Sequence, residues 1–317
     1  MPATQKQIRE WLPETLEIFF RFMPPCPKPP PKVYVCGEKM FFIRRSELTE
    51  RLHAQRMDVD EQHHDAMMEL IHGDLGDAIL IRQPYIASLR ESPMAYTLFQ
   101  RFLWHELGHY YAINCECPEE DLHRFNDPAN AEDPVKQEGY WFWSEFVAEA
   151  ISFRVDELHC RIDNRELYHP ERITWEPRVW GCLSDGLLDL LEETFGAFSG
   201  TELDSYPLAM YFATLLTDDA TKHYVQAAYD AKWLVYDNEA GENKPMTPGS
   251  FDPTLISDQS EEYQETLREL KAVLEERMKR ERFWEIDGEW LRRLGEFMLR
   301  LSDIKKALIE KYEREDA

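Results

Sequence analysis

The sequence has few basic residues and no long apolar run. It contains 36 Lys and Arg residues against 61 Asp and Glu residues, which gives a formal net charge of −25 at pH 7. Nucleic acids and anionic membrane surfaces are also negative, so this charge argues against both as partners and favours a basic peptide or protein substrate. No apolar run reaches the roughly 18 residues that a membrane-spanning helix needs, so we expect none.

The sequence also lacks a secretory pattern and a cysteine framework. Residues Met1 to Glu10 are polar and of mixed charge, with no apolar segment behind a basic start, so we expect a cytoplasmic protein. The six cysteines of this long chain predict reduced thiols rather than disulfides. Cys115 and Cys117 form a pair with no matching second pair, so we expect no second metal site there.

What the sequence does contain is an HExxH motif, in the middle of a helical pattern from Tyr96 to Asn114. Its residues are His105, Glu106 and His109. Residues four apart lie one turn from each other on the same helix face, so two imidazoles can bind one metal ion. A Zn²⁺ ion with three protein ligands keeps a position for water and lowers the pKa of that water from about 15.7 to about 7. Glu106, beside the metal, is then placed to take the proton as the water attacks a carbonyl.

The segment around this motif has the pattern of a buried helix. Phe99, Phe102, Leu103 and Tyr110 give it a broad apolar face at the spacing of a helix. Gly108 costs a helix about 1 kcal/mol relative to Ala, which predicts that a neighbouring backbone approaches closely there. The alternative interpretation is a core helix whose two histidines only hydrogen-bond.

A second helical pattern carries two acidic residues in apolar surroundings. Glu145 and Glu149 are four residues apart within SEFVAEAISF, at 144–153. Carboxylates are costly to bury without partners, and a metal and its histidine supply one partner each. Glu145 is then the third ligand, and Glu149 accepts the ring N–H of a ligand histidine and fixes its tautomer. The alternative is a solvated acidic face on a surface helix.

At these residues the sequence resembles a known class of enzymes. HExxH followed by ExxAE looks like the gluzincin metallopeptidases, in which the Glu that opens the second motif is the third zinc ligand. HELGH with SEFVAEAISF is similar to the ImmA/IrrE-like intracellular zincins, and the second motif alone to membrane zincins of the HtpX type. The resemblance implies that His105, His109 and Glu145 bind zinc, that Glu106 is the catalytic base and that Glu149 orients a ligand histidine.

The segments before the motif predict a small sheet among helices. Gln5 to Phe22 has helical spacing and ends at a proline-rich connector, 24–31, for which we expect polyproline II conformation. Lys32 to Cys36 and Met40 to Ile43 are short apolar runs that predict a hairpin or two strands. Glu47 to His72 predicts a helix with a charged face.

Asp77 to Ala87 alternates and is rich in branched residues, so it predicts a strand just before the HExxH helix. The resemblance implies that this strand runs along the active-site cleft and pairs with an extended substrate, and Pro84 fits an edge strand. Cys115 to Gly139 is acidic and irregular, which predicts a flap over the cleft. The aromatic run that follows, 140–143, predicts an anchor for the flap that packs in the core.

The rest of the chain predicts further helices and a boundary. Leu183 to Phe195, Tyr206 to Thr217 and Lys222 to Tyr236 have helical patterns, and Asp237 to Asp258 has the composition of a domain boundary. An oxyanion donor is needed for a tetrahedral intermediate, and four residues are open candidates. These are Tyr211, His223, Tyr224 and Tyr229.

The expected fold is therefore α+β: a mostly helical zincin-like domain with a small sheet at 1–240 and a C-terminal helical hairpin at 259–317. The hairpin segment has 13 basic and 16 acidic residues, so the catalytic part carries nearly all of the net charge.

The expected function is a soluble zinc-dependent peptidase with Glu106 as general base. The alternative is a regulatory protein of zincin fold that binds a partner without cleaving it. An intact Glu106 favours the enzyme, because a protein that only binds has no need of a base.

Overall fold

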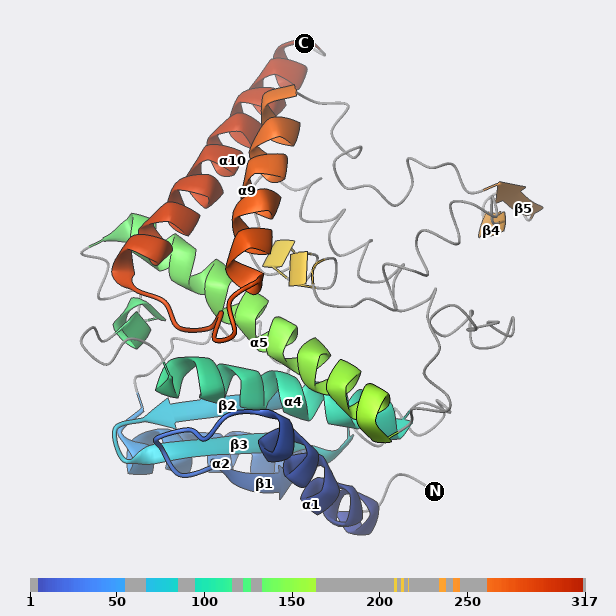
Figure 1. Ribbon diagram of the computed structural model, residues 1–317, viewed down its shortest axis with the longest axis vertical. Helices are drawn as coiled ribbons and strands as arrows, with labels where there is room; N and C mark the ends of the chain where they lie inside the picture. The colour runs from blue at the N-terminus through green and yellow to red at the C-terminus, as the bar shows by residue number, and fades with distance from the viewer. Residues whose placement is uncertain are drawn as a thin grey trace. The chain divides into compact units, whose positions relative to one another are not determined.

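The fold is α+β and mostly helical in the part of the chain that the computed structural model describes (Figure 1). The described residues are 5–54, 67–84, 95–115, 122–126, 133–163, 208–209, 212–213, 216, 234–237, 242–245 and 261–315. Within these ranges there are six α-helices, a three-stranded sheet and a two-stranded sheet. None of the described helices combines the length and the apolar character that crossing a bilayer requires.

The chain divides into two compact units that each draw on several segments. The first unit is formed by 1–133, 147–164 and 284–288, and the second by 134–146, 165–283 and 289–317. The division falls inside one continuous helix, α5 (Pro134–Asp163), between Phe146 and Val147. Residues on both sides of this point therefore keep helical spacing to each other.

The sheet of the first unit has its most apolar strand in the middle. Its strands are β1 (Lys32–Cys36), β2 (Met68–Gly73) and β3 (Gly76–Arg82), in the order β1-β3-β2. β3 pairs in parallel with β1 and antiparallel with β2. Residues 78–82 of β3 are all buried, as expected for a strand covered on both faces.

The strand expected at the edge of the sheet, just before the HExxH helix, is the central strand β3, so this expectation is wrong. β3 is flanked on both sides, and Pro84 lies beyond its last residue, so β3 offers no free edge to a substrate. The edge strand next to that helix is β2 instead. The sequence pattern shows that β3 is a strand, but only the pairing partners decide which strand is at the edge.

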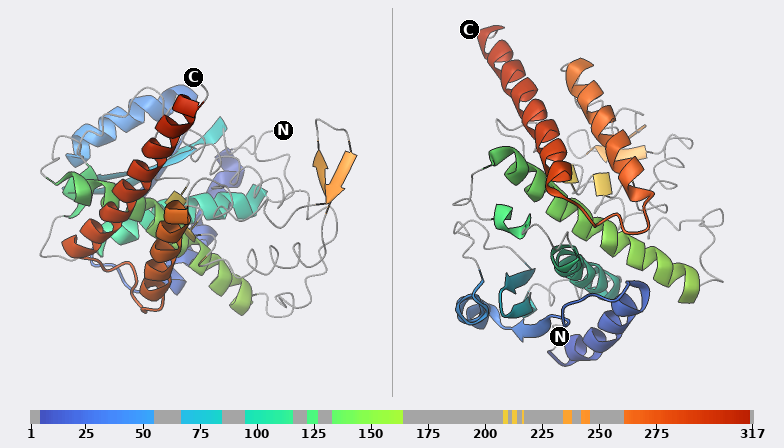
Figure 2. Two further views of the ribbon diagram at one scale, coloured as in Figure 1. Left: turned by 90° about the horizontal axis from the view of Figure 1, so that it is seen from above. Right: turned by 60° about the vertical axis from the view of Figure 1, so that its left-hand side comes forward.

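Helices cover the sheet from both sides (Figures 1 and 2). α2 (Glu38–Leu52) packs against β3 and encloses an apolar cluster. The cluster contains Cys36, Phe41, Leu48, Ile71, Ala78 and Leu80. The HExxH helix, α4 (Ala95–Asn114), packs against β2, and α1 (Gln5–Phe22) packs against α4. Both segments are helices, as their spacing predicts.

Two expected boundaries in this unit are wrong. Met40 to Ile43 belongs to α2 rather than to a strand, because Gly37 at the N-cap and Glu38 in the first turn start a helix before this run. The expected helix from Glu47 to His72 ends at Leu52, and its last five residues lie in β2, where pairing with β3 overrides the helical pattern.

α5 begins earlier than the sequence predicts. It starts at Pro134, a residue well suited to the first helical position, so 134–139 are not part of a flap. A short 3₁₀ helix, η2 (Leu122–Asn126), lies in the same expected loop, and 116–121 and 127–132 lie outside the described residues. The aromatic run packs as core: Tyr140, Phe142 and Trp143 are buried.

The second unit contains two long C-terminal helices and a small hairpin. α9 (Glu261–Met278) and α10 (Gly288–Glu315) lie side by side (Figures 1 and 2), and Arg300 pairs with Glu269 across them. β4 (Leu234–Asp237) and β5 (Glu242–Pro245) form an antiparallel pair. The expected helix up to Tyr236 is therefore wrong at its end. Leu183 to Phe195 lies outside the described residues.

Candidate metal centre

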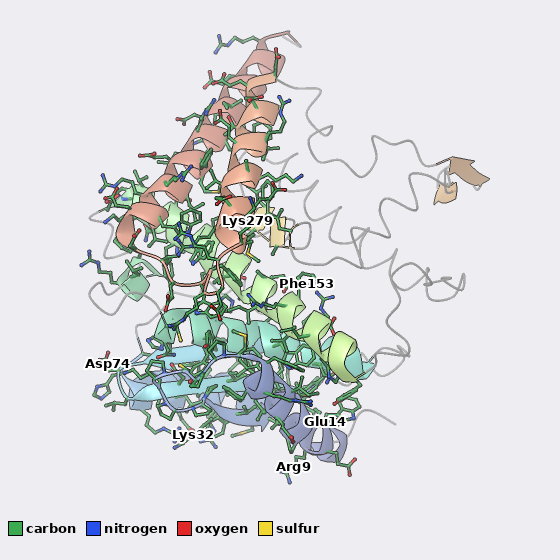
Figure 3. All side chains as sticks on the ribbon, viewed as in Figure 1. Arg9, Glu14, Lys32, Asp74, Phe153 and Lys279 are labelled. Carbon is green, nitrogen blue, oxygen red and sulfur yellow. The ribbon has the colours of Figure 1, made fainter. Side chains whose placement is uncertain are left out.

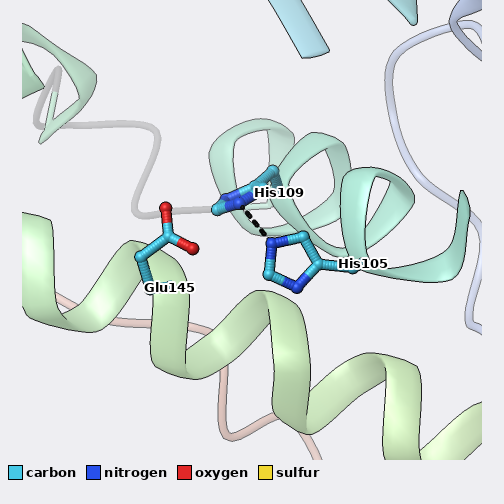
Figure 4. A group of neighbouring side chains, drawn as sticks. All are labelled: His105, His109 and Glu145. Carbon is cyan, nitrogen blue, oxygen red and sulfur yellow. Dashed lines mark hydrogen bonds between the residues drawn. The ribbon is translucent and has the colours of Figure 1, made fainter. Parts of the chain in front are cut away.

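Three side chains from two helices meet with the geometry of a metal site. His105 and His109 come from α4 and Glu145 comes from α5, and one ligand atom of each lies within 4.8 Å of the others (Figure 4). All three residues are half-buried. Among the described residues, this is the one group of three His, Cys, Asp or Glu side chains found at such distances. The structure thus brings together the three residues that the sequence motifs single out as ligands.

The separation of the two histidines fits a zinc ion. Nε2 of His109 lies 3.1 Å from Nε2 of His105, a distance at which the two rings also hydrogen-bond to each other (Figure 4). Two nitrogens that each bind a tetrahedral Zn²⁺ at about 2.05 Å are about 3.3 Å apart. The helical spacing of the HExxH motif therefore sets the two rings almost at the separation that one shared ion requires. Glu145, with rotatable bonds along its side chain, completes a set of two imidazoles and one carboxylate, which suits zinc.

Glu149 lies against the far side of one of these rings. Its Oε2 is 2.9 Å from Nδ1 of His105, and the residue is only 8% exposed. A carboxylate accepts hydrogen bonds only, so Nδ1 of His105 carries the proton and Nε2 presents a lone pair toward the metal position. The alternative of a solvated acidic face does not describe α5 at Glu149.

A further residue, Arg101, completes this set of contacts. Its Nη2 donates to Oε1 of Glu149 at 3.2 Å, so the two oxygens of this carboxylate contact an arginine and a histidine. The guanidinium carbon lies 3.8 Å from the ring centroid of Phe153, and the Ser152 hydroxyl donates to the Arg101 carbonyl. Phe153 is a residue of α5 and is labelled in Figure 3. Sequence analysis missed Arg101, although its position four residues before His105 places it on the same helix face.

Glu106 contacts the edge strand rather than the histidines. Its Oε2 accepts a hydrogen bond from the Leu70 N–H at 2.8 Å. The Arg82 N–H donates to the Met67 carbonyl, so the hydrogen-bonded pairs of the β2–β3 ladder fall on 67, 69, 71 and 73. The backbone groups of 68, 70 and 72 consequently face the open edge, and Glu106 lies at that edge.

The two helices approach closely at Gly108. A Cβ atom there would lie 2.6 Å from the Ala148 carbonyl oxygen and 2.8 Å from the Ala148 Cα, so the expected close approach of a backbone is confirmed. Ala148 stands between Glu145 and Glu149 in the sequence. The contact between glycine and alanine therefore brings both carboxylates of α5 to the face of α4 that carries the histidines.

The residues expected to stabilise an oxyanion cannot be placed at the site. The candidate oxyanion donors Tyr211, His223, Tyr224 and Tyr229 lie outside the described residues. No protein-family model matches the sequence, and neither a curated protein nor a solved structure matches it. A function for this chain must therefore rest on its own residues.

Proposed function

We propose that the protein is a cytoplasmic, zinc-dependent metallopeptidase of the gluzincin type that hydrolyses peptide bonds in peptide or protein substrates. The observation that supports this most is the meeting of His105, His109 and Glu145 within 4.8 Å, on two helices whose sequence motifs resemble those of that class. Glu149 at Nδ1 of His105 adds to it, because ligand histidines in zinc sites commonly donate their second ring N–H to a carboxylate.

In this proposal each side chain has one task. A Zn²⁺ ion held by His105, His109 and Glu145 supplies a Lewis acid and a site at which the pKa of water is lowered. Glu106 takes the proton of the attacking water and then delivers it to the leaving amine. The Leu70 N–H holds one oxygen of Glu106, which fixes the orientation of this base. Glu149 keeps His105 in the tautomer that binds metal.

The edge of β2 offers a way to bind an extended substrate. Its backbone groups at 68 and 72 and the Leu70 carbonyl face away from β3, on the side where Glu106 holds the Leu70 N–H. An added peptide strand gains main-chain hydrogen bonds that need no particular side chain. A peptide bound along β2 is thereby brought beside the base, which supports a peptide as the substrate class.

The first test is zinc content. We expect about one zinc per chain in the wild type by elemental analysis, and a dissociation constant raised at least tenfold in Glu145→Gln. Glu138→Gln is the matched control, because Glu138 lies two turns earlier on α5 and the chemical change is the same. Equal zinc affinity in the two variants, or a folded wild type that binds no zinc, contradicts the site.

The second test separates hydrolysis from metal binding. Glu106→Gln keeps a carbonyl oxygen that accepts from the Leu70 N–H, so we expect it to fold and to bind zinc like the wild type. Lacking a base, it should cleave a mixed peptide library at least 100-fold more slowly, as followed by mass spectrometry. Equal cleavage by the variant contradicts the role of Glu106. A zinc-loaded wild type that cleaves nothing favours the partner-binding alternative.

A further inference from the structure

Two cysteines far apart in the sequence face each other beside the HExxH helix. Cys26 lies in the proline-rich connector between α1 and β1, and Cys115 directly follows α4. Their sulfur atoms are 3.8 Å apart, across a sequence separation of 89 residues. Both belong to the first unit, and both are reduced thiols rather than disulfides. Neither takes part in the metal centre.

The chain on each side of Cys26 is fixed to α4. The Tyr111 hydroxyl donates to the Pro24 carbonyl at 2.6 Å, and the Tyr110 hydroxyl donates to the Lys28 carbonyl at 2.8 Å. Both tyrosines are fully buried. Cys115 is held in turn by its own N–H, which donates to the Tyr111 carbonyl. The hydrogen bonds at Pro24, Lys28 and Cys115 thus hold the backbone of both cysteines so that their sulfur atoms lie close together.

The surroundings also favour the reactive form of Cys26. Donation from the Cys115 thiol lowers the pKa of Cys26 to about 6, with help from the Tyr110 hydroxyl and the backbone at Lys28. Partial burial and the charge of Asp77 act in the opposite direction. The thiolate is the nucleophile in disulfide exchange, and it therefore predominates at neutral pH. Cys26 is also partly exposed, whereas Cys115 is buried.

Cys36 provides a contrast in the same unit. It is buried in the apolar cluster under α2, and burial raises the pKa of its thiol. The one contact between cysteine sulfurs recorded among the described residues is that of Cys26 with Cys115. A reagent that selects for exposed thiolates should accordingly modify Cys26 and leave Cys36 unmodified.

We propose that Cys26 and Cys115 form a modification site for low-molecular-weight disulfides such as glutathione disulfide. The Cys26 thiolate attacks one sulfur of glutathione disulfide, forms a mixed disulfide and releases one glutathione thiolate, which takes up a proton. Cys115 then attacks the Cys26 sulfur and expels the second glutathione, which takes the proton from the Cys115 thiol. The two cysteines are oxidised to one disulfide, and glutathione disulfide is reduced to two glutathione molecules.

Closing this bond requires only a small movement. A disulfide has an S–S length of about 2.05 Å, so the sulfurs must approach by less than 2 Å, roughly what small χ1 rotations give. The product links the connector to the C-terminal end of the helix that carries His105 and His109. Because it closes a long loop, it restricts the unfolded chain and stabilises the folded one.

The test is to map disulfides in the full-length wild type after incubation in glutathione buffers of graded redox potential, followed by acid quenching, alkylation and mass spectrometry. We expect the peptide that links Cys26 to Cys115 as the main product, and a thermal midpoint that rises by about 5 °C or more on oxidation. Cys36 should stay reduced. A main product in which Cys26 is unlinked, or in which Cys115 pairs with Cys117, overturns the proposal.

Variants and pH identify the attacking sulfur. Cys115→Ser should stop at the mixed disulfide and accumulate one glutathione on Cys26, whereas Cys26→Ser should react at least tenfold more slowly. The initial rate for wild type should rise from pH 5 through about 6 and then level off, following the thiolate of Cys26. A rate that keeps rising to pH 9 means that the attacking thiol has an ordinary pKa, and this overturns the assignment of Cys26. The pH profile is measured on the wild type, so this test holds even if a serine variant fails to fold.

Discussion

The contacts at the candidate metal centre continue beyond its three candidate ligands. Arg101 donates to Glu149, and Glu149 accepts from His105, so the ring that faces the metal position is held by a charged pair. A carboxylate buried with a histidine alone would carry a large desolvation cost. Arg101 offsets part of this cost, and its own guanidinium is stacked on Phe153. We therefore expect Arg101 to be a positioning residue for zinc.

Arg101→Met should lower zinc affinity about tenfold, within the range measured for residues that orient metal ligands. Met keeps most of the length of the side chain but cannot donate to Glu149. Zinc affinity should be measured by competition with a chromophoric chelator. Arg51→Met is the control, because Arg51 contacts the Tyr34 hydroxyl on the far side of the sheet. Similar zinc affinities in both variants contradict the positioning role.

Single residues show how far the sequence could predict the site. His105, Glu106 and His109 are given by the spacing of one motif, and Glu145 and Glu149 by the spacing of the second. Arg101 was not predictable in the same way. Its partner becomes known only when α4 lies on α5, and one arginine four residues before a histidine is common on helix surfaces.

The packing of α4 against α5 depends on Gly108, which has no side chain. The predicted consequence is that Gly108→Ala destabilises the protein by about 1–3 kcal/mol, as overpacking does, and weakens zinc binding. Alanine is the better helix former by about 1 kcal/mol, but the atoms it would meet at 2.6 and 2.8 Å are backbone atoms of Ala148 that cannot move aside cheaply. Chemical denaturation and zinc titration measure both effects.

Gly37→Ala is the control for this prediction. Gly37 is the N-cap of α2 with a φ of −69°, and a Cβ there would meet nothing within 4 Å. Its substitution should change the free energy of unfolding by less than about 1 kcal/mol. If Gly108→Ala is as stable as Gly37→Ala and binds zinc like the wild type, the close approach of the helices is not what positions the carboxylates.

The strands show why element boundaries were harder to predict than the grouping of His105, His109 and Glu145. Residues 68–73 continue a helical pattern in the sequence, yet they form β2 because Gly76 permits a tight turn at a φ of 127° and β3 pairs with them. The position of β2 at the edge likewise depends on β1, which lies over 30 residues away. Long-range pairing of this kind leaves no local signal, whereas the metal motifs lie within single helices.

The protein as a whole is strongly acidic. The net charge is −25, and the 59 residues from 259 onward contribute little of it because their basic and acidic residues nearly balance. The acidic excess therefore belongs to the part of the chain that contains the candidate site. Such a field attracts cationic ligands at long range and is screened by salt within roughly 10 Å at 0.1 M ionic strength.

The last prediction concerns the substrate and rests on the proposed function. A peptide with lysines outside the cleaved bond should have a higher kcat/KM than the same peptide with glutamines in their place. This advantage should fall several-fold between about 50 and 300 mM salt, because screening removes the attraction that speeds association. The glutamine peptide should change by less than about twofold. If kcat/KM depends on salt equally for the two peptides, the preference for basic substrates is contradicted. The affinity of both peptides for the Glu106→Gln variant, which binds without cleaving, should be measured as well. It shows whether the lysine peptide binds better even if the wild type cleaves neither peptide.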